Sequence, residues 1–199
     1  MTRFNTYEHH VLRFREVTRD QPRDRVLELG PFEGKITYDL CEIYKEVVAI
    51  EYRSENIRRT EKGLREGGRT NWRIVQGDVT QFDYSQLGTF DLVYNSGVLY
   101  HVPEPWNLLS SLNAVAPVMW VCTHIVREGS ENLQGYDGGW WNEHGGLADL
   151  MGGLSPKSFW PTQASLHKMF MDTGWGDFTQ VGDYPDCDNG WRVQYLCKN

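Results

Sequence analysis

The stretch VLELGPFEG, residues 26–34, decides the fold. Val26, Leu27 and Leu29 are strand formers with no turn residue among them, and Gly30 then permits a backbone conformation that other residues resist. Beyond the turn, the apolar residues recur at helical spacing. A buried strand, a sharp turn and a helix place bare backbone at the carboxyl end of the strand. In open α/β sheets, ligands bind at this place.

A dinucleotide site is the first alternative to weigh for this turn. Such a site needs a G-x-G-x-x-G run, because a pyrophosphate must approach bare backbone and a helix N-terminus closely. Phe32 stands at the second glycine position and Glu33 would face the phosphates, so the run disfavours an anion. Glu28 suits a cationic cofactor without phosphates, such as S-adenosylmethionine with its sulfonium and ammonium groups. An ordinary strand-to-helix turn without a ligand is the other interpretation.

Length and composition limit the possible classes of protein. The 199 residues suffice for one domain, residues 1–199, with a substantial core. A formal net charge of −7 argues against non-specific binding to nucleic acid, although a local basic patch could still bind it. No apolar run approaches the roughly 18 residues of a membrane span, and no signal-peptide core is present, so we expect a cytoplasmic protein. Cys41 and Cys122 lie in apolar patterns and are expected to be buried free thiols.

Residues 1–20 are expected to hold an amphipathic N-terminal helix. Apolar residues recur there at helical spacing, namely Phe4, Tyr7, Val11, Phe14 and Val17. The simpler interpretation is a helix packed on the edge of the domain, and the alternative is a lid over the cofactor.

Two further predicted strands end on acids. Residues 46–51 read EVVAIE, apolar as in a strand covered on both faces, and Glu51 lies 21 residues after Gly30. In nucleoside-binding α/β folds an acid at this place accepts hydrogen bonds from both ribose hydroxyls, because a carboxylate offers two acceptors in one plane. The strand at residues 71–78 ends on Asp78, which suits the exocyclic amino group of an adenine. A solvated strand end and an Asx turn are the respective alternatives.

The later strands complete the predicted sheet. Residues 90–97 and 118–124 continue the alternation of strands and helices, which predicts an α/β fold with a doubly wound, mainly parallel sheet. Residues 178–184 and 191–197 are expected to form the last two strands, and the DNG turn at 188–190 favours an antiparallel hairpin. The expected sheet is therefore Rossmann-like and seven-stranded, with a C-terminal antiparallel hairpin.

Residues 127–158 interrupt this alternation and are too long for a plain connector. Glycines and large aromatic residues occur together there, which is typical of a mobile lid that shapes a pocket. We therefore expect a lid or insertion loop whose Trp140, Trp141 and His144 bind the substrate. A disordered crossing is the alternative, although tryptophan is uncommon in disordered segments.

Four stretches resemble the class I S-adenosylmethionine-dependent methyltransferases: VLELGPFEG, VVAIEYR, IVQGDV and FDLVYNSGVLYHVPEPWNLL. The resemblance covers roughly residues 25–125, and the expected C-terminal hairpin agrees with it. GVLYHVPEP is also similar to the tRNA wobble-uridine-modifying methyltransferases, and SFWPT to uncharacterised bacterial relatives of that group. The resemblance is specific for fold and cofactor, and it says little about the substrate.

The resemblance implies a role for each matching residue. The methionine part of the cofactor would contact Glu28, Gly30 and Gly34, the ribose Glu51, and the adenine Asp78 and the backbone of Val79, while Asn95 or Ser96 would lie beside the sulfonium. The usual family loop has a glycine where Phe32 stands, which shifts the expected contact toward Gly34. No arginine or lysine is clearly placed to hold an extra carboxylate on the cofactor, so the carboxymethyl-transfer variant is not assigned.

Methyl transfer is an in-line displacement, so the enzyme chiefly aligns the acceptor with the methyl group. Where the acceptor must lose a proton, His101 and His124 are the candidate bases, because both follow strands at the reacting edge of the sheet. Tyr100 could instead orient an acceptor hydroxyl, and either histidine could equally be a capping or core residue. A metal site of His101, His124, Glu143 and His144 is a further alternative, but no metal is expected, since their spacing is irregular.

Three functions remain open from the sequence. Methylation of a small molecule, such as a sugar or natural product, most directly at oxygen, fits the tryptophan-rich lid and the acidic charge. Modification of tRNA or another RNA needs a basic surface, for which the candidates are Arg13, Arg15, Arg19, Arg23, Arg25, Arg58, Arg59 and Arg65. A cofactor-binding module without enzymatic activity is the third.

Overall fold

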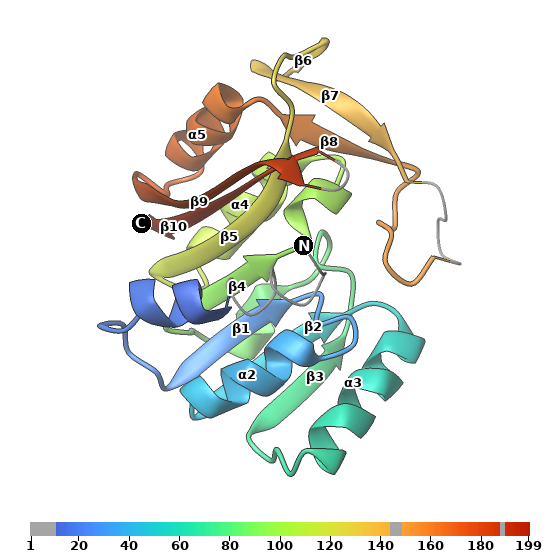
Figure 1. Ribbon diagram of the computed structural model, residues 1–199, viewed down its shortest axis with the longest axis vertical. Helices are drawn as coiled ribbons and strands as arrows, with labels where there is room; N and C mark the ends of the chain where they lie inside the picture. The colour runs from blue at the N-terminus through green and yellow to red at the C-terminus, as the bar shows by residue number, and fades with distance from the viewer. Residues whose placement is uncertain (1–10, 144–148, 188–189) are drawn as a thin grey trace.

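A computed structural model describes residues 11–143, 149–187 and 190–199 of the chain. Its main feature is a seven-stranded sheet with the strand order β3-β2-β1-β4-β5-β10-β9 (Figure 1). The strands are β1 (Arg25–Leu29), β2 (Glu46–Glu51), β3 (Trp72–Gln76), β4 (Leu92–Ser96), β5 (Val118–Ile125), β9 (Asp177–Cys187) and β10 (Gly190–Lys198). The first five are parallel, and β10 pairs antiparallel with both β5 and β9. The predicted sheet with its terminal antiparallel hairpin is confirmed.

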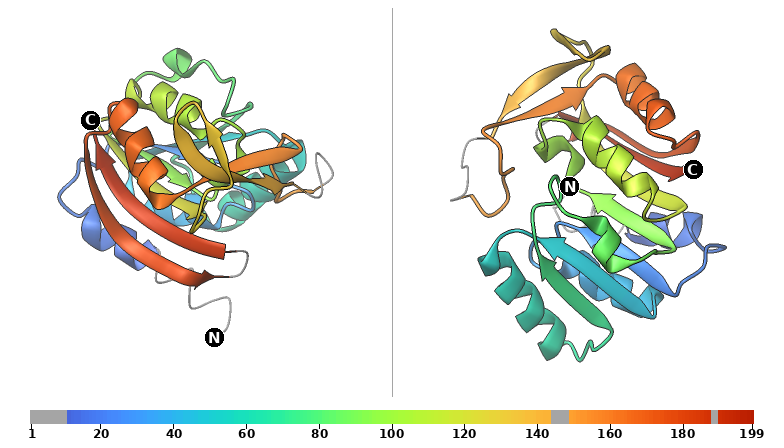
Figure 2. Two further views of the ribbon diagram at one scale, coloured as in Figure 1. Left: turned by 90° about the horizontal axis from the view of Figure 1, so that it is seen from above. Right: turned by 180° about the vertical axis from the view of Figure 1, so that it is seen from behind.

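Helices cover both faces of the sheet. Helix α2 (Lys35–Ile43), α3 (Ser54–Glu66) and the helical residues 11–17 pack on one face, where Leu40 and Leu64 join one apolar cluster. Helices α4 (Pro105–Asn113) and α5 (Gln163–Asp172) pack on the other face. Figure 2 shows α4 and α5 on the near side of the sheet when the molecule is seen from behind. The chain is therefore doubly wound, as the alternation of elements predicted.

Strand β1 shows how the sequence produces both faces. Val26 belongs to the cluster under α2 and α3, whereas Leu27 and Leu29 belong to the cluster under α4 and α5. Successive strand residues point to opposite faces, so Glu28 shares the α2 face with Val26. This alternation carries a carboxylate into the interior beside the turn that follows β1.

The order of the strands reverses beside β1. From β1 the chain runs outward through β2 to β3, and it then returns to place β4 on the other side of β1. Leu29 consequently pairs with Ile50 on one side and with Asn95 on the other. The strand ends separate at this reversal and leave a crevice, which is the usual ligand site of a doubly wound sheet. Two 3₁₀ turns, η1 (Tyr84–Leu87) and η2 (Leu99–His101), flank β4.

The structure differs from the expected loop over residues 127–158. A second, three-stranded antiparallel sheet occupies much of this range, formed by β6 (Glu131–Leu133), β7 (Tyr136–Asn142) and β8 (Lys157–Pro161). Glycine serves close packing here, because a Cβ on Gly138 would lie 2.4 Å from the ring of Phe159. Between β7 and β8, residues 149–156 have no regular secondary structure and lie beside the main sheet, at the right of Figure 1.

The described part of the N-terminal helix packs on the face of the main sheet that α2 also covers, against β4 and β5. Phe14 is buried and meets the rings of Tyr94 and Trp120 edge-on, with centroids 5.0 and 5.4 Å away. Phe4 and Tyr7 lie outside the described residues. Cys41 and Cys122 are buried free thiols, as predicted. Across the described ranges, no helix has the length and apolar character needed to cross a membrane.

Candidate functional site

A cleft of about 620 Å³ opens at the carboxyl ends of the parallel strands, where the strand order reverses. Its walls come from the turns after the first four strands and from the segment between β7 and β8. The lining residues are 30–33, 51–53, 77–80, 96–98, 100–103 and 150–155, together with Glu28, Lys35, Ile36, Ile50 and Asn56.

Two acids predicted to hold the cofactor, Glu28 and Glu51, both line this cleft and are both buried. Burial raises the pKa of Glu28 to about 8; the Thr37 hydroxyl opposes this, and the charges of Glu51 and Asp39 add to it. Among the described residues, Oε2 of Glu28 has no hydrogen-bond partner. Glu51 accepts a hydrogen bond from the backbone N–H of Arg53 at 2.8 Å. The cleft therefore holds two neighbouring carboxyl groups with unused acceptor capacity.

The turn after β1 has an unusual backbone. Gly30 and Gly34 have φ angles of 60° and 78°, and Phe32 between them has a φ angle of 53°. A phenylalanine in this left-handed region is strained, and the hydroxyl of Thr60 donates to its carbonyl at 2.8 Å. Gly30 and Phe32 line the cleft, whereas Gly34 is not among the lining residues. A Cβ on Gly34 would meet Cγ2 of Thr60 at 2.6 Å, so its described role is close packing of α2 and α3.

The predicted adenine residues line the cleft beyond β3. The side chain of Asp78 accepts hydrogen bonds from the N–H and hydroxyl of Thr80, at 2.9 and 2.8 Å, in an Asx turn. The carbonyl of Val79 accepts from the hydroxyl of Tyr84 at 2.8 Å. Asp78 can therefore act both as an Asx-turn residue and as an adenine contact, because the turn uses only Oδ1 and leaves Oδ2 outside it.

Asn95 and Ser96, the two residues predicted beside the sulfonium, differ in whether they reach the cleft. Ser96 lines the cleft, but Asn95 is fully buried and absent from its lining. The reason is the strand alternation, which turns adjacent side chains to opposite faces.

His101 lines the cleft and carries an oriented imidazole. Its Nδ1 lies 3.0 Å from Oε1 of Glu143, whose side chain is only 3% exposed. Burial raises the pKa of Glu143, but hydrogen bonds from His101, the Gly153 N–H and Ser158 outweigh it, so the net shift is downward. An ionised Glu143 accepts a hydrogen bond from Nδ1–H, and the neutral imidazole then carries its lone pair on Nε2, as a general base requires.

His124, the other predicted base, lies behind the cleft and is absent from its lining. Its ring stacks on Trp160 at 4.8 Å and meets Tyr100 edge-on at 4.5 Å. Burial, with the charge of Arg192, lowers the pKa of His124 to about 4. The guanidinium of Arg192 lies 3.1 Å from Nε2 and uses its lone pair. Tyr100 does line the cleft, and burial raises the pKa of its hydroxyl.

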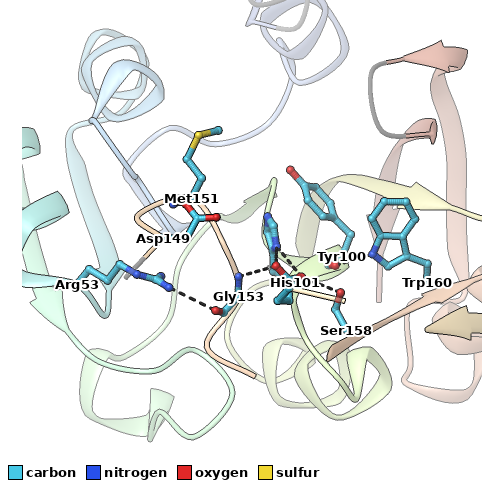
Figure 3. Close-up of polar contacts among 9 residues, drawn as sticks. Arg53, Tyr100, His101, Asp149, Met151, Gly153, Ser158 and Trp160 are labelled. Carbon is cyan, nitrogen blue, oxygen red and sulfur yellow. Dashed lines mark hydrogen bonds and ion pairs between the residues drawn. The ribbon is translucent and has the colours of Figure 1, made fainter. Parts of the chain in front are cut away.

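Residues 150–155 cover one side of the cleft. The Arg53 guanidinium donates to the carbonyl of Gly153 at 3.3 Å, and the Asn56 amide donates to the carbonyl of Leu150 at 3.0 Å. Figure 3 shows Arg53 on one side of Gly153 and His101 on the other. We call residues 150–155 the covering segment. It lies within the range that the sequence predicted as a lid.

The predicted substrate residues lie apart from the cleft lining. Trp140 and Trp141, on β7, are 40% and 36% exposed, and they pack on Phe159 and Trp160 respectively. His144 lies outside the described residues. The substrate role of these three residues stays a prediction.

Sequence reasoning did not find the pairing of Glu143 with His101, nor the roles of Arg53, Asn56 and Gly153. Glu143 entered only as a candidate metal ligand, because nothing in the sequence relates it to a histidine 42 residues earlier. The only local signal was its place near Trp140 and Trp141 in the middle of the predicted loop, residues 127–158, which does not identify a partner for the acid.

Comparison with known proteins gives a domain match and two sets of relatives. Residues 27–116 match the methyltransferase domain family. Ribosomal RNA small subunit methyltransferase A of Geobacter metallireducens is 29% identical over 116 residues, which cover 57% of this chain and 38% of that protein. The same-named protein of Lachnoclostridium phytofermentans is 26% identical over 129 residues, covering 62% and 43%. The chain thus spans about two fifths of the length of these curated relatives.

The structural similarity extends over almost the whole chain. The N-terminal domain of EvdMO1, solved in the presence of S-adenosylhomocysteine and D-fucose, has a TM-score of 0.85 and 28% identity, covering 96% of this chain and 81% of that one. An S-adenosylmethionine-dependent methyltransferase from Clostridium acetobutylicum has a TM-score of 0.66 at 14% identity, covering 95% and 89%, and shows the fold alone. The Rossmann-like methyltransferase fold implied by the sequence is confirmed.

Proposed function

We propose that this chain, which has the Rossmann-like methyltransferase fold and matches the methyltransferase domain family over residues 27–116, methylates a hydroxyl group of a small molecule with S-adenosylmethionine as the donor. The observation that carries the proposal is the pair of buried carboxyl groups, Glu28 and Glu51, facing one cleft at the reversal of strand order. A nucleotide phosphate would be repelled there, whereas a cation is attracted.

The lining residues fit the donor. Oε2 of Glu28 has no hydrogen-bond partner within the described part of the chain and offers an acceptor to an ammonium group, and Glu51 offers its remaining acceptor sites to the ribose hydroxyls. Asp78 and Val79 line the cleft beyond β3 and are the proposed contacts of the adenine, and Ser96 lines the wall at the end of β4. The solved domain of EvdMO1, 28% identical, was crystallised with S-adenosylhomocysteine, which supports the same cofactor here.

The donor would supply a methyl group activated by positive sulfur, and it would leave as S-adenosylhomocysteine when its S–CH₃ bond breaks. The protein then has to align an acceptor and remove its proton. His101 is the proposed base: Nε2 takes the hydroxyl proton as the oxygen gains the methyl group, and Glu143 stabilises the resulting imidazolium. Tyr100 lines the same wall and is proposed to orient the acceptor. The presence of D-fucose with the EvdMO1 domain supports a sugar-like acceptor.

RNA methylation is the second candidate, since the curated relatives act on ribosomal RNA by name. Among the eight arginines that could contact phosphates, seven have an acidic side chain as an ion-pair partner: Arg13, Arg15, Arg19, Arg25, Arg58, Arg59 and Arg65. Their charge is therefore largely balanced on the surface, and a polyanion would have to displace those acids. This favours the small-molecule acceptor.

Two measurements test the proposal. Calorimetric titration should give saturable binding of S-adenosylhomocysteine and none of NAD⁺ or ATP. A bacterial extract separated into small-molecule and RNA fractions is then incubated with the protein and donor labelled in the methyl group. We expect label in the small-molecule fraction. Label only in RNA supports the second candidate, binding without transfer to either fraction supports a cofactor-binding module, and preferential binding of NAD⁺ or ATP overturns the assignment.

A further inference from the structure

Glu143 joins the candidate base to the covering segment. Its buried carboxylate accepts three kinds of donor: Nδ1 of His101 at 3.0 Å, the Gly153 N–H at 2.9 Å and the Ser158 hydroxyl at 2.8 Å. These donors come from η2, the covering segment and β8. A single carboxylate therefore holds three separate parts of the chain together beside the cleft.

Gly153 fits this junction because it has no side chain. A Cβ built on Gly153 would lie 2.5 Å from the carbonyl oxygen of His101 and 3.2 Å from Cδ of Glu143. The first contact is with backbone, which cannot move aside cheaply. Even an alanine here would push the covering segment away from the imidazole and its partner.

The opposite side of the covering segment is tied to α3. Arg53 and Asn56 donate to the carbonyls of Gly153 and Leu150, at 3.3 and 3.0 Å, just after the β2 acid Glu51. The peptide unit of Gly153 thus stands between the part of the cleft proposed for the ribose and the part proposed for proton transfer. The N–H of Gly153 donates to Glu143 on one side of the segment, and its carbonyl accepts from Arg53 on the other side.

We infer that Glu143 and Gly153 are positioning residues that make His101 a competent base when the covering segment lies over the cleft. This inference rests on the proposed function for the role of His101, and it adds the residues on which that role depends. With the segment in place, Glu143 is sheltered from water and paired with donors, so it fixes the Nδ1–H form of the imidazole. With the segment displaced, Glu143 loses the Gly153 donor and gains water, and its hold on the imidazolium weakens.

The charged and titratable groups around the imidazole define the expected pH effect. Glu143 contacts the imidazole directly, and the ring centroid of Tyr100 lies 4.3 Å from that of His101. His124 lies on the far side of Tyr100, and Arg192 donates to His124. Among these groups Glu143 is the anion in direct contact, and it favours the protonated imidazole. Removing or solvating Glu143 should therefore make His101 lose its proton at a lower pH.

The test follows the His101 ring by NMR titration in the full chain, with the signal assigned from a His101→Asn variant. The variants are Glu143→Gln and Gly153→Ala, and Gly63→Ala is the control, because a Cβ on Gly63 meets nothing within 4 Å. We expect the titration midpoint of His101 to fall in both variants and to stay unchanged in the control. Thermal unfolding of each variant shows whether the chain is folded, and Ser158→Ala gives a milder loss of the same network should Glu143→Gln not fold.

Activity supplies the second readout once the wild-type chain transfers methyl groups. We expect Glu143→Gln and Gly153→Ala to lower kcat at least tenfold, and the acid limb of the pH–rate profile to move to lower pH. An unchanged His101 midpoint in folded Gly153→Ala and Glu143→Gln overturns the inference, whatever the activity. Failure of the wild-type chain to bind S-adenosylhomocysteine would instead overturn the proposed function, so the two failures are distinguishable.

Discussion

The carboxyl groups of Glu28 and Glu51 face the same cleft from neighbouring strands, and the charge of Glu51 helps to raise the pKa of Glu28. Burial is the larger cause of the shift. Two acids placed together in a buried hollow repel each other unless one is protonated or a cation lies between them. In the ligand-free chain the raised pKa keeps Glu28 largely protonated near neutral pH, whereas a positively charged ligand beside the two acids would favour their ionised forms.

The first prediction concerns stability against pH. The pKa of Glu28 rises from an ordinary 4.5 to about 8 in the folded chain. Between those values the folded state retains a proton that the unfolded chain has lost, so stability falls as pH rises through this window and levels off above it. Relative to the wild type, Glu28→Gln should gain stability on the order of a few kcal/mol between pH 5 and about 8. Urea unfolding of the ligand-free chain at both pH values measures the difference.

An exposed acid gives the matched control for Glu28. Glu66, at the end of α3, has a side chain that is 68% exposed, so Glu66→Gln should follow the wild type at both pH values. Parallel pH profiles of Glu28→Gln and the wild type would contradict the raised pKa.

The second prediction concerns the affinity for the donor. Glu51→Gln keeps the shape of the side chain and removes its charge, so S-adenosylhomocysteine should bind at least about tenfold more weakly, as expected for losing a charged hydrogen-bond acceptor. Glu46→Gln, at the other end of the same strand, is the control and should bind as the wild type does. Calorimetric titration measures both, and equal affinities would remove Glu51 from the site.

The third prediction separates the two histidines. His101 lines the cleft with Nε2 available, whereas His124 lies outside the lining, with its pKa lowered to about 4 and its Nε2 engaged by Arg192. His101→Asn should lower kcat by about a hundredfold or more and leave the affinity for S-adenosylhomocysteine within twofold. His124→Asn should retain the wild-type dependence of rate on pH. A rate that survives in His101→Asn would mean that no base is needed or that another group supplies it.

The main sheet could be predicted because its strands carry local signals. Val26, Leu27 and Leu29 precede the turn glycine Gly30, residues 47–50 are a continuous apolar run, and the sequence DNG at 188–190 predicts a hairpin between the last two strands. The small sheet of β6, β7 and β8 could not, because its glycines resemble loop glycines in sequence. Gly138 is needed under the ring of Phe159, a residue 21 positions later whose proximity only the fold creates. Tertiary packing thus determines that this segment forms strands, although its local sequence did not distinguish strand from loop.

The same distinction applies to the site. Glu28, Glu51 and Asp78 could be found as cleft residues because each lies in, ends or closely follows a predicted strand, and parallel strand ends share one edge of a sheet. Asn95 and Ser96 could not be told apart without the phase of the strand, which a single residue reverses. Glu143 could not be found as a partner of His101, since the contact joins η2 to the end of a strand in a sheet that the sequence did not reveal.

The last prediction concerns Gly34, for which the family resemblance implies a cofactor contact and the structure shows close packing. Gly34 has a φ angle of 78°, and a Cβ there would lie 2.6 Å from Cγ2 and 3.1 Å from Cα of Thr60. Gly68 has a similar φ angle of 73°, but a Cβ there would meet nothing within 4 Å. Gly68→Ala should therefore cost only the left-handed strain, about 1 kcal/mol, whereas Gly34→Ala should cost roughly 2 to 4 kcal/mol, because overpacking is added. Urea unfolding compares the two. If both variants lose the same stability and only Gly34→Ala loses affinity for S-adenosylhomocysteine, the glycine acts on the cofactor and not on the packing of α2 against α3.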